Sequence, residues 1–133
     1  MEKYDPLYIS FFYHFNVARD YFECHEVMEE LWLEEGRYPF YQGLLQIAVG
    51  LYHHRNGNVN GAVKLFTAGM QKLRDYRSPW TGIDLEGLLR DSEIYLDKLE
   101  RIAEAPFEQY DLSITIVDPA LRRQVEEFAD RRQ

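Results

Sequence analysis

The stretch FYQGLLQIAVGLYHHR, residues 40–55, is apolar on nearly every side when it is drawn as a helix. Such a helix needs other elements around it, because apolar surface left in water is unfavourable. Pro39 precedes it, and Asn56-Gly57-Asn58 after it is typical of a turn. We therefore expect residues 40–55 to be the central helix of an all-α protein.

Four further helices are expected around this central one. Apolar spacing and helix-end signals place them at residues 7–20, 22–35, 60–75 and 85–103. Asp5-Pro6 opens the first, Gly36 ends the second and Asp84 caps the last. The helix expected at residues 60–75 has a single apolar stripe and should form a helical hairpin with the central helix. The expected fold is a single-domain all-α bundle of about five helices, with its core at residues 5–103.

The C-terminal extension, residues 104–133, has a different pattern. LSITIV, residues 112–117, is rich in β-branched residues, which favour an extended edge segment. Asp118-Pro119 is a helix-start signal and predicts a last, charged helix that runs to the C-terminus. We expect this less regular tail to belong to the same domain, residues 1–133.

Composition limits the class of function. The net charge of -8 over 133 residues disfavours nucleic acid and anionic membrane surfaces, since both are bound mainly by clustered Lys and Arg. The most apolar stretch, GLLQIAVGLY at residues 43–52, is too short to cross a bilayer, and the N-terminus lacks a signal-peptide pattern. Cys24 is the only cysteine, so no internal disulfide can form. We expect a soluble cytoplasmic protein that binds neither nucleic acid nor membranes.

The stretch ECHEVMEELW, residues 23–32, places one histidine among glutamates. On a helical wheel, the solvated acidic arc contains Glu23, Glu26, Glu30 and Glu34. Glu29 instead lies about 40° from His25, on an arc with large apolar residues that include Phe22 and Trp32. Because an unpaired carboxylate in such surroundings costs several kcal/mol, we expect Glu29 to face the core and to pair with His25.

The central helix offers further polar side chains to this pair. Gln42, Gln46 and His53 fall within about 40° of one another on it, and buried polar groups are normally hydrogen-bonded. His54 is about 100° from His53 and is expected to meet solvent, while Cys24 should be a small core residue. We therefore predict a polar pocket lined by His25, Glu29, Trp32, Gln42, Gln46 and His53.

The chemistry of the His25–Glu29 pair has two interpretations. The i, i+4 spacing suits a Zn²⁺, Mn²⁺ or Fe²⁺ site with metal-assisted hydrolysis, in which Glu29 is ligand or base and Glu26 takes no part. The spacing departs from known signatures, because the zinc-protease motif needs His where Glu29 stands and the di-iron motif needs Glu where Phe22 stands. In the second interpretation the pair is a hydrogen-bonded strut. The small-molecule ligand, and whether the protein is an enzyme, stay open.

The alternative function is a non-enzymatic helical protein-interaction module, expected to be a homodimer. The His25–Glu29 pair would then only organise the core. Exposed aromatic residues would meet the partner, and the candidates are Tyr38, Tyr41 and Trp80.

Two blocks of the sequence resemble a family of small helical proteins. FNVARDYFECHEVMEELW, residues 15–32, carries a His-x-x-x-Glu-x-x-Trp motif at His25, Glu29 and Trp32, and the second block is FYQGLLQIAVGLYHHRNGNVNGAVKLF, residues 40–66. They resemble the family called domain of unknown function 309. The resemblance implies an all-α fold and metal binding by the motif, and it places Gln42 and Gln46 beside it.

Overall fold

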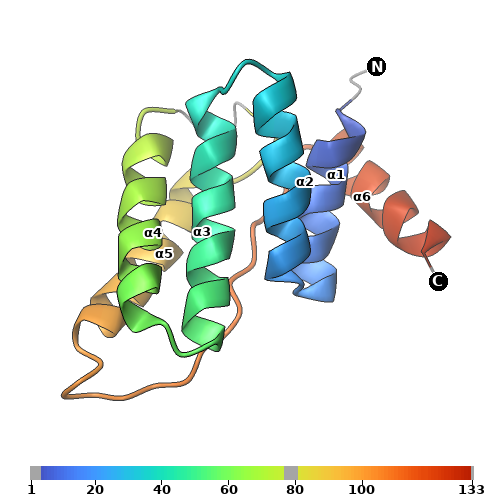
Figure 1. Ribbon diagram of the computed structural model, residues 1–133. Coiled ribbons are helices and arrows are strands. Elements are labelled where there is room, and N and C mark those ends of the chain that lie inside the picture. Colours follow the sequence, from blue (N-terminus) through green and yellow to red (C-terminus); the bar gives the residue numbers. More distant parts are fainter. Residues whose placement is uncertain (1–3, 77–80, 133) are drawn as a thin grey trace.

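The computed structural model describes residues 4–76 and 81–132, and the regular elements in this part of the chain are helices (Figure 1). The α-helices in this part are α1 Pro6–Tyr13, α2 Tyr21–Glu34, α3 Pro39–Arg55, α4 Val59–Leu73, α5 Leu85–Glu100 and α6 Pro119–Arg131. A π-helical turn, η1 His14–Ala18, follows α1. Within the same ranges no strand forms, and the expected edge segment makes only an isolated antiparallel bridge between Ile83 and Ile116. The all-α prediction is confirmed.

Side-chain caps explain where most helices begin. At every α-helix except α3, the residue just before the helix accepts a hydrogen bond through its side chain from a backbone N–H of the first turn. These capping residues are Asp5, Asp20, Asn58, Asp84 and Asp118. Each cap satisfies a donor that the helix itself leaves unpaired. After α2, Gly36 has a φ of 75°, a left-handed conformation that glycine adopts without steric cost. The start and stop signals in the sequence therefore act as predicted.

Helix α3 packs most extensively against its neighbours α4 and α2, which flank it in Figure 1. Glycines set the distance between α3 and α4. A Cβ on Gly69 would lie 2.9 Å from the carbonyl oxygen of Gly43, and a Cβ on Gly50 would lie 2.7 Å from the Phe66 ring. Larger residues at these positions would push the two helices apart, so the glycines allow the close hairpin.

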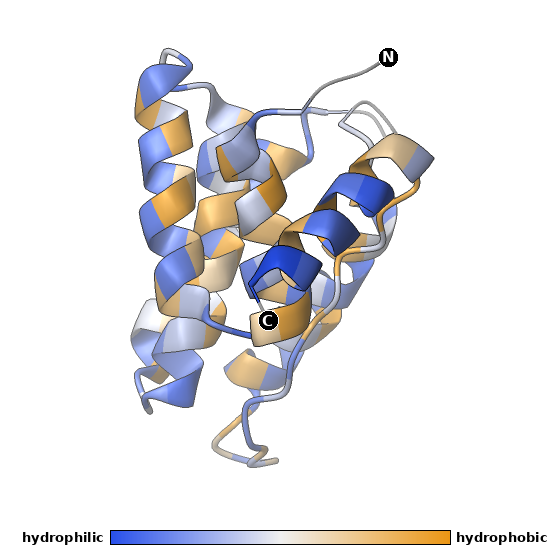
Figure 2. Cartoon of the chain, turned by 90° about the vertical axis from the view of Figure 1, so that its right-hand side faces the viewer, coloured by the Kyte–Doolittle hydropathy of each residue, from blue (hydrophilic) through white to orange (hydrophobic). Residues whose placement is uncertain are grey.

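The hydrophobic core draws side chains from every α-helix and from the tail. The tail segment contributes Leu112 and Ile114, and α6 contributes Leu121 and Val125. Helix α6 packs on α1 and turns a largely hydrophilic outer surface to the viewer in Figure 2. The C-terminal extension is therefore part of the common core and ends in a regular helix.

Candidate functional site

A cavity of about 210 Å³ opens between α2 and α3, and its lining residues are Tyr21, Phe22, His25, Val49, Tyr52 and His53. Its wall is aromatic: the ring centroids of Phe22 and Tyr52 are 6.0 Å apart, and those of Phe22 and His25 are 6.4 Å apart. The side chain of Phe22 is 53% exposed, so this ring is the most accessible part of the wall. The result is a largely apolar recess in which the imidazoles of His25 and His53 stand among aromatic rings.

Helical spacing builds this cavity. On α2, Phe22 and His25 are three residues apart and share one face, while Asp20 caps the helix just before them. On α3, Val49, Tyr52 and His53 are likewise three and four residues apart. Each helix thus supplies one turn of side chains to the space between them.

His25 lies between two carboxylates of its own helix. Its Nε2 is 3.4 Å from Oε2 of Glu29, and its Nδ1 is 3.7 Å from Oε1 of Glu26. Both glutamate side chains are 52% exposed. The predicted contact between His25 and Glu29 is confirmed, but the prediction that Glu29 faces the core is wrong. Glu26 is exposed, as predicted for the acidic arc, and it also contacts His25.

The reason lies in how α2 is oriented. Its buried residues include Cys24, Met28 and Leu31, which lie roughly 100–160° around the helix from Glu29. A helical wheel fixes the angle between two residues but leaves open which side of the helix is covered. Phe22 was assigned to the covered side for the same reason, and its exposure shows that assignment to be wrong.

The other predicted pocket residues have different neighbours. His53 lines the cavity beside His25, with its Nδ1 3.5 Å from Nδ2 of Asn58. Gln46 is turned to α4, where its Oε1 accepts a hydrogen bond of 3.0 Å from Nζ of Lys72. Gln42 is half-buried and does not line the cavity.

Trp32 also does not line this cavity. The guanidinium of Arg37 lies 5.4 Å from the centroid of the Trp32 ring. Within the described residues, the buried Nε1 of Trp32 has no hydrogen-bond acceptor. Of the aromatic residues expected to meet a partner, Tyr38 and Tyr41 are partly buried against the core. Trp80 lies outside the described residues.

His54 is buried, contrary to the expectation that it meets solvent. It is 7% exposed, and its Nδ1 lies 2.5 Å from the hydroxyl of Tyr95. Burial lowers the pKa of His54, while its contact with the backbone of Phe107 acts in the opposite direction. Helix α5 and the tail therefore cover the side of α3 that carries His54.

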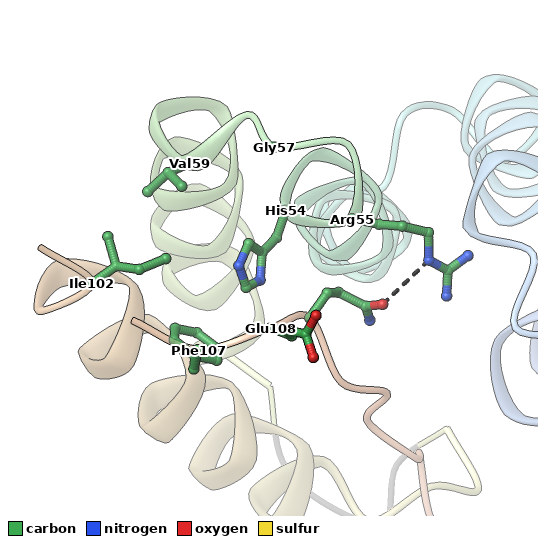
Figure 3. Close-up of a pocket in the computed structure, with 8 residues that line it drawn as sticks. His54, Arg55, Gly57, Val59, Ile102, Phe107 and Glu108 are labelled. Atoms are coloured by element: carbon green, nitrogen blue, oxygen red, sulfur yellow. Dashed lines mark hydrogen bonds between the residues drawn. The ribbon is translucent and has the colours of Figure 1, made fainter. Parts of the chain in front are cut away.

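A larger hollow of about 520 Å³ lies beside His54, between the end of α3, the end of α5 and the tail (Figure 3). Two of its polar side chains, Arg55 and Gln109, are already hydrogen-bonded to each other. Nε of Arg55 donates to Oε1 of Gln109 at 3.2 Å, and Nη1 of Arg55 donates to the backbone oxygen of Arg19 at 3.0 Å. Because these groups hold the tail, we take the smaller aromatic cavity as the candidate site.

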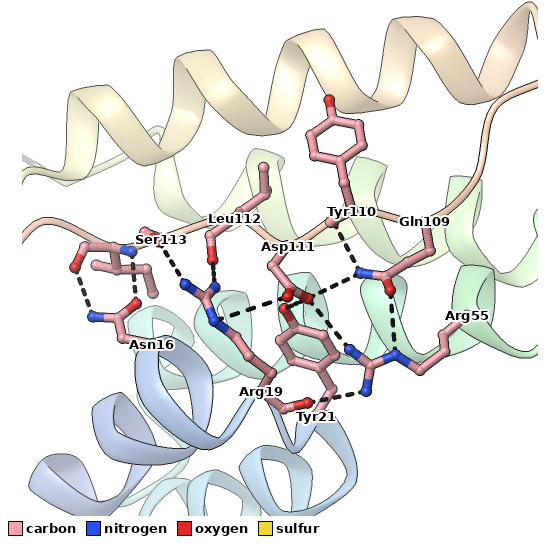
Figure 4. A network of polar contacts seen from close by, with 10 residues as sticks. Asn16, Arg19, Tyr21, Arg55, Gln109, Tyr110, Asp111, Leu112 and Ser113 are labelled. Atoms are coloured by element: carbon pink, nitrogen blue, oxygen red, sulfur yellow. Dashed lines mark hydrogen bonds and ion pairs between the residues drawn. The ribbon is translucent and has the colours of Figure 1, made fainter.

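A polar cluster centred on Asp111 fastens the tail to α2 and α3 (Figure 4). The hydroxyl of Tyr21 donates to Asp111 at 2.6 Å, Nη2 of Arg55 donates to it at 3.3 Å, and Nε of Arg19 lies 3.9 Å away. Partial burial raises the pKa of Asp111, but hydrogen bonds from Tyr21 and Gln109 and the two arginine charges outweigh it, so the pKa is lowered. No local pattern in the sequence indicates this cluster, because Arg55 and Asp111 are 56 residues apart.

The described residues do not assemble a metal-ligand set. Nowhere in them do three or more His, Cys, Asp or Glu side chains come together in a group that could hold an ion. His25 and Glu29 offer two donors, whereas zinc sites use three or four protein ligands. Cys24 is fully buried, its thiol donates to the backbone oxygen of Phe11, and burial raises its pKa. The prediction that Cys24 is a small core residue is confirmed.

None of the helices in the described ranges combines the length and apolarity needed to span a membrane.

Comparison with known proteins supports the family indicated by the motifs. Residues 8–65 match the family model of DUF309, a domain of unknown function. The chain is 35% identical over 105 residues to "Uncharacterized protein YpuF" of Bacillus subtilis (strain 168), an alignment that covers 75% of this chain and 60% of that protein. The chain thus spans less than two thirds of that relative, and no solved structure matches. All the cavity-lining residues fall inside the family match, whereas Asp111 lies outside it.

Proposed function

We propose that this protein is a binding module that accepts one large apolar or aromatic side chain of a partner protein in the cavity between α2 and α3. The observation that carries the proposal is an aromatic-walled recess of about 210 Å³ beside the exposed ring of Phe22. Binding energy at protein interfaces concentrates where an anchor side chain fills such a pocket.

The size of the cavity favours a side chain over a free metabolite. Sites for small molecules enclose about 300–1,000 Å³. The recess, at about 210 Å³, is smaller, but it exceeds the share of several water molecules in liquid water, about 30 Å³ each. Fully burying an exposed Phe side chain is worth about 1.5–3 kcal/mol. Phe22 is 53% exposed, so a partner that covers its ring gains roughly half of that.

The alternative is the metal-assisted hydrolase suggested by the sequence, with His25 and Glu29 as ligands of Zn²⁺, Mn²⁺ or Fe²⁺. It needs at least one further donor from the protein. The binding proposal needs no group beyond the residues that already line the recess, and for that reason we prefer it.

Titration of the ¹⁵N-labelled protein with indole and 4-methylphenol, analogues of the Trp and Tyr side chains, tests the proposal by NMR. We expect saturable shifts at the amides of residues 21–25 and 49–53, and none with acetamide. Val49→Trp should fill the recess and abolish the shifts, whereas Val117→Trp, at a residue 41% exposed on the tail, should preserve them.

Indole shifts that never saturate, or that persist in Val49→Trp, would contradict the proposal. Saturable shifts with Zn²⁺ at His25 and Glu29, without any effect of indole, would support the metal alternative instead.

A further inference from the structure

Helix α2 presents a mixed stripe to solvent beside the recess. Phe22, Glu26, Glu29 and Leu33 follow at i, i+4, i+7 and i+11, which places them within roughly 60° of one another along about 16 Å of helix. Phe22 is 53% and Leu33 is 49% exposed, and the two glutamates stand between them. An apolar residue therefore lies at each end of an acidic centre.

The negative charge along α2 is not balanced by basic residues of the same helix. Between residues 20 and 36 the sequence has no Lys or Arg, and its glutamates there are Glu23, Glu26, Glu29, Glu30, Glu34 and Glu35. In the described part of the chain, none of these six pairs with Lys or Arg, and only Glu26 and Glu29 contact His25. Desolvation and the neighbouring carboxylates, Glu30 foremost, raise the pKa of Glu34. Among the described residues, this surface therefore carries a net negative charge.

We propose that the partner segment is a basic amphipathic helix that lies along α2, inserts one large apolar side chain into the recess and sets Lys or Arg against Glu26 and Glu29. This inference rests on the proposed function and names its partner class. Helices that dock on a protein surface present their anchors at i, i+3, i+4 and i+7. The stripe on α2 also advances in steps of three and four residues, so a helix lying along α2 can face it over its whole length. Opposite charge on the two surfaces supplies orientation and association rate.

Charge also argues against a second copy of the chain on this surface. A two-fold contact through the stripe would bring two rows of glutamates together, between chains that each carry a net charge of -8. The stripe therefore does not favour the homodimer expected from the sequence. Nucleic acid is disfavoured for the same electrostatic reason.

Fluorescence anisotropy with labelled synthetic peptides tests the inference on the full chain. The probe is a helix of about 16 residues, roughly 24 Å long, with one Trp and several Leu on one face and Lys beside them. Its controls are a scrambled peptide of the same composition and a peptide with Glu in place of Lys. We expect the basic amphipathic peptide to bind at least about tenfold more tightly than either control, and to weaken with salt.

Matched protein variants separate the stripe from net charge. Glu26→Gln with Glu29→Gln should weaken the peptide about fivefold, by loss of two exposed ion pairs. Glu126→Gln with Glu127→Gln removes the same charge from exposed positions on α6 and should leave binding unchanged.

Equal loss in the two double variants, or equal binding of the scrambled peptide, would overturn the inference. If indole binds the recess but the Glu26→Gln, Glu29→Gln variant binds the peptide as tightly as the wild type, the inference is wrong and the proposed function stands. If indole shows no saturable shifts, the proposed function itself fails.

Discussion

Helices α2 and α3 have two contrasting surfaces. On the tail side, where residues 107–114 lie, Arg19, Arg55 and Tyr21 all converge on Asp111, so their polar groups are used within the protein. On the open side, which carries the recess and the stripe, the ring nitrogens of His25 lie beside the exposed carboxylates of Glu26 and Glu29, and Phe22 is exposed to solvent. The difference teaches that one helix pair can use one surface for stability and leave the other for binding.

The largest expected effect is a loss of stability when a buried side chain on the tail side is shortened. Ile114 is 2% exposed, and its backbone exchanges two hydrogen bonds of 2.9 Å with the side chain of Asn16. Ile114→Ala should lower the free energy of unfolding by about 2–4 kcal/mol, because it leaves a cavity in the core. Phe22→Ala on the open side is the control and should change it by less than about 1 kcal/mol. Chemical denaturation measures both, and equal losses would contradict the comparison.

A smaller loss is expected from Asp111→Ala, which leaves Arg19 and Arg55 without their shared carboxylate. Because the side chain of Asp111 is 39% exposed, solvent screens much of the interaction, and we expect about 1–2 kcal/mol. Hydrogen exchange should show faster opening of residues 109–114 while α3 and α4 keep their protection. Glu93→Ala, which removes an exposed contact to Arg74, is a matched control and should leave the tail unchanged. Uniform faster exchange across the whole chain would count against a local clamp.

The pH dependence of stability tests the tail side, because His54 is buried there. Burial lowers the pKa of His54 in the folded protein, so below about 6.5, the ordinary value, the unfolded state takes up the proton more readily. Stability is therefore fully present above that pH and declines as the pH falls toward the folded-state pKa. We expect the melting temperature to drop by a few degrees between about pH 7.5 and 5.5.

The control for that experiment is His54→Gln, which does not titrate and can still hydrogen-bond the hydroxyl of Tyr95. Its melting temperature should fall less with acid than that of the wild type. An identical fall in the two proteins would assign the pH dependence to other groups, such as buried His14, whose pKa burial also lowers.

The helices were predictable because their signals are local. Asp84 caps α5 by accepting a hydrogen bond from Gly87, three residues later, and Asp118 caps α6 in the same way two residues on. The buried side of α2, in contrast, depends on where α1 and α3 pack, which no local signal states. His53 and His54 show the same limit: their separation around α3 was correct, but α5 and the tail decided which of them is covered.

The smallest expected effects on stability belong to His25 and Glu29. If His25 and Glu29 formed a buried strut, His25→Ala and Glu29→Gln would each destabilise the fold. With a 3.4 Å contact between side chains 35% and 52% exposed, we expect losses below about 1 kcal/mol, as for other surface ion pairs. If Glu29→Gln lowered the free energy of unfolding by about 3 kcal/mol in chemical denaturation, the interpretation of the pair as a structural strut would be supported instead.

Binding measurements should distinguish His25 from Glu29, although the two substitutions have similarly small effects on stability. His25 forms part of the wall of the recess, so His25→Ala should weaken indole about threefold through lost packing. Glu29 does not line the recess, so Glu29→Gln should leave indole binding intact and weaken only the basic peptide. The same two titrations on each variant therefore distinguish an anchor pocket with an acidic margin from a single polar site, in which both substitutions would affect both probes equally.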